Sequence, residues 1–86
     1  MWQVYILKCA DKTFYTGITT DLERRVGEHN SSDLGARYTS GRRPVRLVYA
    51  QNFANRSLAS KEEIRIKNLS REEKIDMIKK YVSIKK

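Results

Sequence analysis

The fold of this chain is decided by two neighbouring stretches, WQVYIL (residues 2–7) and FYTGIT (residues 14–19). Aromatic and β-branched residues dominate both stretches, and these residue types favour strands. The short polar stretch between them is typical of a hairpin turn. Because side chains alternate along a strand, we expect Val4 and Ile6 on one face of the sheet and Tyr5 on the opposite face.

A helix is expected directly after the hairpin. The tetrapeptide TDLE (residues 20–23) fits a capping box in which the threonine is the N-cap residue. Leu22 and Val26, at positions i and i+4 of this helix, should face the core. Arg25 and His29 form a second i, i+4 pair beside that stripe, so their side chains should lie on the same side of the helix.

The rest of the chain predicts one more strand and two more helices. A loop rich in Ser, Asp, Gly and Thr covers residues 30–41, and an alternating strand follows at residues 45–50. One helix is expected over residues 57–67, and the next begins after the capping box SREE (residues 70–73). In this last helix, apolar residues at i, i+3 and i+7 predict a core stripe: Ile75, Ile78 and Val82.

The order of these elements, β-β-α-β-α-α, predicts an α+β fold. Its small three-stranded sheet should be mainly antiparallel and flanked by helices. The 86 residues suffice for one domain, which we expect to span residues 1–86.

One carboxylate interrupts the core-facing side of the helix at residues 57–67. The series that should face the core runs Ala59, Glu63, Ile66. A carboxylate in an apolar stripe is costly unless it is paired or binds a metal ion. Glu63 is therefore either one partner of a buried salt bridge with a nearby Lys or Arg, or a metal ligand.

The charge of the chain favours a polyanionic partner. Lys and Arg number 18 against 10 Asp and Glu, which gives a net charge of +8. Such a field suits nucleic acid or an anionic membrane, and the alternative is a basic surface with no such partner. Cys9 is the single cysteine, which excludes a disulfide framework and a thiolate zinc site. Without a signal-peptide pattern or a long apolar run, we expect a cytoplasmic, monomeric protein that does not bind a membrane.

Tyr5 and Tyr15 stand ten residues apart on the hairpin, and the second belongs to the tripeptide Tyr-Thr-Gly (residues 15–17). Alone, the two tyrosines are typical of a cross-strand aromatic pair. With Arg25, His29 and Glu63 downstream, they make a pattern that resembles the GIY-YIG nuclease domain over nearly the whole chain. It is most similar to the small stand-alone bacterial YhbQ-like branch, on three stretches: YTGITTDLERR (15–25), GARYT (35–39) and RRPVRLV (42–48).

Two positions depart from the family pattern. Gln3 replaces the first glycine of the family name, and Thr16 replaces an aliphatic residue in the second element. Neither change removes a phenol, so both tyrosines keep their chemical groups.

The resemblance implies a metal-dependent endonuclease that hydrolyses phosphodiester bonds in nucleic acid. DNA is the expected substrate, as a repair or recombination intermediate. Tyr5 is expected to act as the general base, with hydrogen-bonding help from Tyr15 and His29, because an unperturbed tyrosine has a pKa of about 10. Arg25 should clamp the phosphate, and Glu63 should hold one Mg²⁺ or Mn²⁺ ion.

Each of these residues also has an ordinary structural interpretation. Arg25 could be an exposed helix arginine, as its neighbour Arg24 is expected to be. His29 could be a helix cap or a surface residue.

Basic side chains and one aromatic ring cluster in and after the loop, as in surfaces that follow a nucleic-acid backbone. Tyr38 could instead pin the loop to the core, and Lys67 could be a solvated helix lysine. The residues expected to contact nucleic acid are Gly17, Arg37, Tyr38, Thr39, Arg42, Arg43 and Lys67.

Two other functions fit the same pattern. The chain could be a nucleic-acid-binding module that has kept the nuclease scaffold with little catalysis. It could also be one subunit of a larger nuclease, in which a protein partner chooses the substrate.

Overall fold

A computed structural model of the chain describes residues 1–31, 39 and 41–85. Its strands form one antiparallel sheet in the order β2-β1-β3 and comprise β1 (Trp2–Lys8), β2 (Phe14–Thr19) and β3 (Arg46–Phe53). The helices of the described residues are α1 (Leu22–Ser31), α3 (Arg56–Lys67) and α4 (Arg71–Lys85). This order confirms the predicted β-β-α-β-α-α arrangement. None of these helices combines the length and apolar character needed to cross a bilayer.

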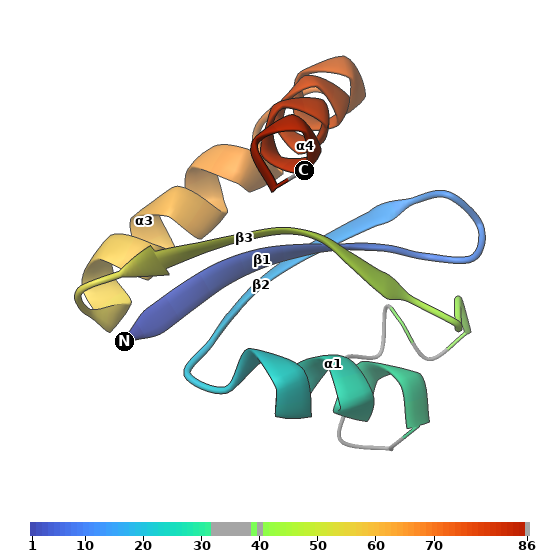
Figure 1. Ribbon diagram of the computed structural model, residues 1–86, viewed down its shortest axis with the longest axis horizontal. Helices are drawn as coiled ribbons and strands as arrows, with labels where there is room; N and C mark the ends of the chain where they lie inside the picture. Colours follow the sequence, from blue (N-terminus) through green and yellow to red (C-terminus); the bar gives the residue numbers. More distant parts are fainter. Residues whose placement is uncertain (32–38, 40, 86) are drawn as a thin grey trace.

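The sheet is covered on both faces, with α3 and α4 on one side and α1 on the other (Figure 1). Val4 and Ile6 belong to the core under α3 and α4, together with Ala59 and Ile66. The opposite face carries a second cluster of buried residues, against which α1 packs its apolar side: Tyr5, Leu7, Cys9 and Val45, with Leu22 and Val26 from α1. The alternation predicted for β1 is therefore confirmed.

The N-terminal caps decide where the helices begin. In α1 the prediction of the threonine as N-cap residue is wrong, because Asp21 Oδ1 accepts from the backbone N–H of Arg24 at 3.2 Å. An aspartate satisfies an amide of the first turn as well as a threonine does, so the helix starts one residue later. The second capping box is confirmed, since Ser70 Oγ accepts from Glu73 N at 3.1 Å and Glu73 Oε1 accepts from Ser70 N at 2.9 Å.

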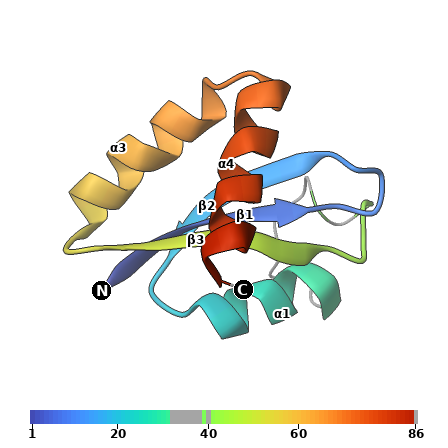
Figure 2. The ribbon, with the colours of Figure 1, turned by 45° about the horizontal axis from the view of Figure 1, so that its top comes forward.

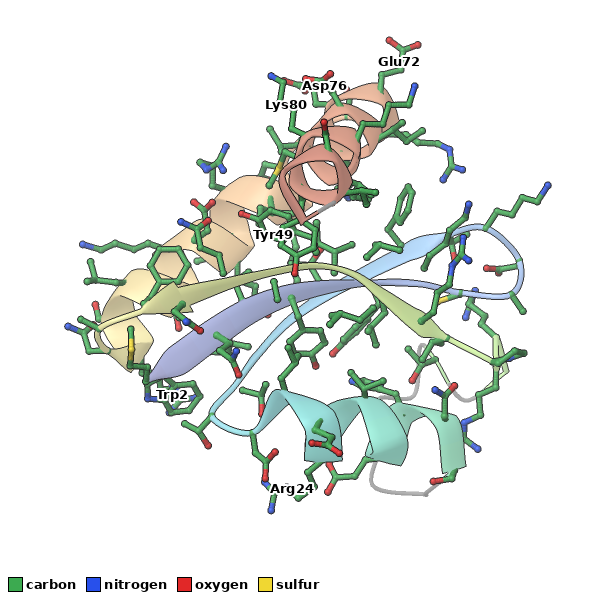
Figure 3. All side chains as sticks on the ribbon, in the orientation of Figure 1. Trp2, Arg24, Tyr49, Glu72, Asp76 and Lys80 are labelled. Carbon is green, nitrogen blue, oxygen red and sulfur yellow. The ribbon has the colours of Figure 1, made fainter. Side chains whose placement is uncertain are left out.

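The predicted core stripe of α4 is only partly correct. Ile78 packs on the core with Met77 and Tyr81, but Val82 is 44% exposed. The reason is geometric, because α4 runs across the strands (Figure 2) and Val82 borders an open groove instead of the core. Tyr49 of β3 points toward α4 (Figure 3), where its ring centroid lies 5.3 Å from that of Tyr81.

Candidate active site

The site begins at the pair formed by Tyr5 in β1 and Gly17 in β2, which lie opposite each other in the antiparallel register. A Cβ atom added at Gly17 would lie 2.6 Å from Tyr5 Oη and 2.7 Å from Tyr5 Cζ. These distances are too short for any side chain, so the phenol lies directly on the glycine backbone. The glycine therefore marks a close approach of the phenol to the backbone of β2.

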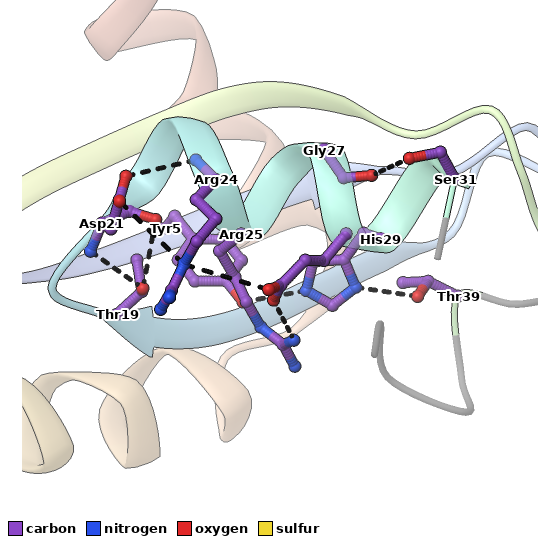
Figure 4. Close-up of polar contacts among 10 residues, drawn as sticks. Tyr5, Thr19, Asp21, Arg24, Arg25, Gly27, His29, Ser31 and Thr39 are labelled. Carbon is purple, nitrogen blue, oxygen red and sulfur yellow. Dashed lines mark hydrogen bonds and ion pairs between the residues drawn. The ribbon is translucent and has the colours of Figure 1, made fainter. Parts of the chain in front are cut away.

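A buried chain of hydrogen bonds runs from this phenol to His29 of α1 and on to Thr39 (Figure 4). Tyr5 Oη lies 3.0 Å from His29 Nε2, and His29 Nδ1 lies 2.8 Å from Thr39 Oγ1. His29 and Thr39 are completely buried and Tyr5 is 1% exposed. Both ring nitrogens of the histidine are therefore engaged, which fixes the orientation of the imidazole.

Burial keeps the Tyr5 phenol and the His29 imidazole, the two titratable groups of this hydrogen-bonded series, neutral. The pKa of Tyr5 is raised to about 12, chiefly by desolvation; Tyr15 and Glu63 contribute to the rise, and the Arg25 guanidinium opposes it. Desolvation also lowers the pKa of His29 to about 4, and the Arg25 guanidinium adds to the lowering. In the protein alone, Tyr5 is thus a protonated phenol and His29 a neutral imidazole at neutral pH.

Tyr15 adds a third ring to this group. Its ring centroid lies 6.4 Å from that of Tyr5 and 5.0 Å from that of His29. The two tyrosines are therefore a cross-strand aromatic pair, and in addition both contact the histidine. Neither interpretation of the hairpin tyrosines excludes the other.

Arg25 turns toward the phenol, while its neighbour Arg24 does not. The Arg25 side chain is 26% exposed, and its Nη1 donates to Glu28 Oε1 at 2.9 Å. Arg24 is 66% exposed and points away from the sheet (Figure 3), as expected of a solvated arginine. Sequence reasoning missed Glu28 as the partner of Arg25, although their i, i+3 spacing on one helix indicates it.

Glu63 lies on α3, which packs over β1 and β2. Its side chain is 21% exposed, and its Oε2 lies 3.3 Å from Lys67 Nζ one turn later. The glutamate is therefore half-buried and paired, and it still acts electrostatically on Tyr5. Lys67 accordingly lies beside the same carboxylate.

The donor set at Glu63 fits a hard cation with few protein ligands. In the described part of the chain, no three His, Cys, Asp or Glu side chains gather closely enough to enclose a metal ion. A carboxylate oxygen is a ligand that Mg²⁺ and Mn²⁺ accept, and Mg²⁺ at phosphate sites typically has one or two carboxylates, water and phosphate oxygens. Glu63 would hold such an ion as its protein ligand.

The residues predicted to contact nucleic acid are spread over different environments. Thr39, which was expected to contact nucleic acid, is completely buried, and its side chain faces His29 instead of solvent. Arg42 Nε donates to Asp11 Oδ2 at 2.9 Å, and Arg43 Nε donates to the carbonyl of His29 at 2.6 Å. Arg37 and Tyr38 lie outside the described residues. No signal in the sequence pointed to the contact between Thr39 and His29, because the two residues stand ten positions apart in the chain.

Comparison with known proteins identifies the family. The model of the GIY-YIG catalytic domain matches residues 1–76. A UPF0213 protein of Desulfotalea psychrophila is 58% identical over 78 residues, which are 91% of this chain and 71% of that protein. A UPF0213 protein of Halobacterium salinarum is 53% identical over 74 residues, which are 86% of this chain and 95% of that protein.

Solved structures agree with this assignment. The solution NMR structure of the UPF0213 protein BH0048 from Bacillus halodurans has a TM-score of 0.59 and 44% identity, covering 92% of this chain and 84% of that chain. The solution NMR structure of the protein EF2693 from E. faecalis has a TM-score of 0.61 and 42% identity, covering 92% and 83%. These findings confirm the resemblance inferred from the tyrosine elements. The chain therefore belongs to the GIY-YIG catalytic-domain family, a nuclease superfamily, and within it to the UPF0213 proteins.

Proposed function

We propose that this chain is a metal-dependent endonuclease that hydrolyses phosphodiester bonds in nucleic acid, with DNA as its substrate. The observation that carries the proposal is the contact of 3.0 Å between Tyr5 Oη and His29 Nε2. It gives the phenol a neutral proton acceptor, and the Arg25 guanidinium acts on the same phenol. We call the hydrogen-bonded series Tyr5–His29–Thr39 the proton relay. The Arg25 guanidinium beside this relay favours removal of a proton from a water molecule next to a phosphate.

The high pKa of Tyr5 requires that its proton leave as the reaction proceeds. In the proposed step, Tyr5 Oη takes a proton from the attacking water while the phenol proton passes to His29 Nε2. The resulting hydroxide oxygen attacks phosphorus, the bond to the leaving oxygen breaks, and the leaving oxygen takes a proton from solvent. The relay requires the His29 tautomer in which Nδ1 carries the proton and donates to Thr39 Oγ1.

The charges around the relay make this transfer depend on the substrate. The Arg25 and Arg43 guanidinium groups lower the pKa of His29 in the protein alone. A bound phosphate beside Arg25 offsets that positive charge and makes the imidazole a better proton acceptor. Arg25 also stabilises the negative charge that builds up on the phosphate oxygens. A Mg²⁺ or Mn²⁺ ion on Glu63 would supply further positive charge at the phosphate.

The test is cleavage of nicked, branched and single-stranded DNA in the presence of Mg²⁺ or Mn²⁺. Tyr5→Phe and Glu63→Gln should each lower the rate about 10²-fold or more. Two matched controls lie outside the site: Tyr49→Phe removes a phenol that bonds Gln51, and Glu62→Gln removes a carboxylate that pairs with Arg65. Cleavage that survives the site variants, or is lost equally in the controls, would refute the mechanism.

A second candidate function is nucleic-acid binding with little catalysis. It is favoured by the pKa of Tyr5, which burial raises to about 12 instead of lowering it toward neutrality. This alternative predicts salt-dependent DNA binding that Tyr5→Phe leaves unchanged, without metal-dependent cleavage. If cleavage appears only when a second protein is added, the chain is instead one subunit of a larger nuclease.

A further inference from the structure

A groove lies on the face of the sheet opposite the Tyr5 site, between α4 and one end of the strands. Its volume is about 540 Å³, within the range of about 300–1,000 Å³ typical of ligand pockets. Apolar side chains make up its walls: Phe14, Leu47, Val48, Ile75, Ile78, Tyr81 and Val82. Leu47 and Val82 are 38% and 44% exposed, so the apolar surface is open to a partner.

Cations also line this groove, on three different elements. They are Lys8 of β1, Arg46 of β3, and Arg71 and Lys79 of α4. Within the described residues, none of the four has a carboxylate within ion-pair distance. Arg71 instead lies over the ring of Phe14, with 5.0 Å from its Cζ to the ring centroid.

The position of two of these cations costs stability. Lys8 and Arg46 lie directly opposite each other in the β1–β3 register. Like charges at such a cross-strand pair are destabilising. An anionic partner in the groove would remove this repulsion, so the charge pattern is complementary to an acidic ligand.

The shape of the groove fits a helix. The residues of α4 that line it are 71, 75, 78, 79, 81 and 82, and they extend over three turns, about 16 Å in length. An amphipathic helix in a groove contacts it through apolar residues at i, i+3, i+4 and i+7. The walls are mostly aliphatic, and Arg71 already covers Phe14, which suits leucine-like side chains better than stacked bases.

We propose that this groove is a docking site for an acidic amphipathic helix of a partner protein. The apolar stripe of that helix packs against α4 and the exposed Leu47, and its carboxylates pair with Lys8, Arg46 and Lys79. A second copy of this chain is a poor occupant because each copy carries a net charge of +8. The inference does not depend on the proposed nuclease activity, since the groove and the Tyr5 site lie on opposite faces of the sheet.

The test uses a synthetic helical peptide of about 16 residues, long enough to follow three turns of α4, with leucines at i, i+3, i+4 and i+7 and glutamates beside them. A scrambled peptide of the same composition keeps the charge and loses the apolar stripe. Binding to the full chain is measured by fluorescence anisotropy, and the contacted amides are mapped by NMR. The designed peptide should bind with a Kd of about 10–100 μM and shift amides of α4 and the adjoining strand ends.

Matched variants separate the groove from the rest of the surface. Val82→Glu, and the pair Arg46→Glu with Lys79→Glu, should each weaken peptide binding about tenfold or more. The controls are Ile64→Glu, at an apolar residue that is 59% exposed on α3, and Lys61→Glu, and both should leave binding unchanged. All these sites are exposed, and amide spectra verify that each variant folds.

Three outcomes would overturn the proposal. The first is no binding of the designed peptide up to about 1 mM, and the second is equal binding of the scrambled peptide, which would mean that the surface responds only to charge. The third is a single-stranded oligonucleotide that shifts the same amides when the designed peptide does not. That result would assign the groove to nucleic acid.

Discussion

Gly17→Ala adds one carbon atom, the Cβ, at the point where the Tyr5 phenol lies on the backbone of β2, and so tests this contact. The new Cβ would meet Tyr5 Oη at 2.6 Å, whereas ordinary contacts begin at 3.4 Å, so the phenol must move by about 0.8 Å. The ring is 1% exposed and bonded to His29, so the move strains a packed core. Overpacking of this kind costs about 1–3 kcal/mol, and loss of glycine entropy in the unfolded chain offsets about 0.4–1 kcal/mol.

We therefore expect Gly17→Ala to lower the free energy of unfolding by about 1–2 kcal/mol and the Tm by about 5–10 °C. DNA cleavage should fall about 10²-fold, because a misplacement of nearly 1 Å separates the phenol from its proton acceptor. Denaturant unfolding and a cleavage assay measure the two effects. The chemical shift of the His29 ring protons reports whether the contact with Tyr5 is lost.

Gly27→Ala is the matched control, because a Cβ at this position of α1 would meet no atom within 4 Å apart from its chain neighbours and the helix's own backbone. Alanine in a helix interior is favoured over glycine by about 0.5–1 kcal/mol, so this variant should be more stable than the parent and should cut DNA normally. The reasoning would be refuted if Gly17→Ala were as stable as the parent, or if both alanine variants behaved alike.

Three more outcomes are expected from the site. Arg25→Ala should lower the cleavage rate about 10²-fold or more, whereas Arg24→Ala, at an exposed arginine, should lower it less than about threefold. Equal losses would refute the proposal that Arg25, and not Arg24, contacts the phosphate. The pKa of His29 falls from 6.5 to about 4 on folding, so the unfolded chain binds more protons between these values. Stability should therefore fall by about 3 kcal/mol as the pH drops from 6.5 to 4. His29→Gln should flatten that pH dependence in denaturant unfolding. Chelation by EDTA should stop cleavage and Mn²⁺ restore it, whereas Glu63→Gln should stay inactive at every Mn²⁺ concentration tried.

Local patterns in the sequence were enough to predict the order of elements. Alternation placed Val4 and Tyr5 on opposite faces of β1, and the Ser70–Glu73 box located the start of α4. The i, i+4 spacing also brought Arg25 and His29 to the same side of α1, beside Tyr5. These predictions succeed because each depends on residues within one or two turns, or along one strand.

For Glu63, the local sequence pattern predicted its position near the core, but only tertiary packing decided its partners. Its place between Ala59 and Ile66 predicted a carboxylate near the core, and those two neighbours are indeed buried. Whether it would pair or bind a metal was left open by the spacing. The structure gives it a salt bridge with Lys67 at 3.3 Å and an electrostatic effect on Tyr5, which belongs to a different element.

The sequence by itself determined which helices and strands form, and that Arg25 and His29 share one side of α1, because helix and strand periodicity and helix caps act over short range. Only the tertiary structure decided that Thr39 is buried against His29, and that burial keeps Tyr5 and His29 neutral. It also decided that Val82 lies beyond the core and borders a groove with cationic residues. These features depend on how α1 and α4 cross the sheet, and such contacts join residues far apart in the chain.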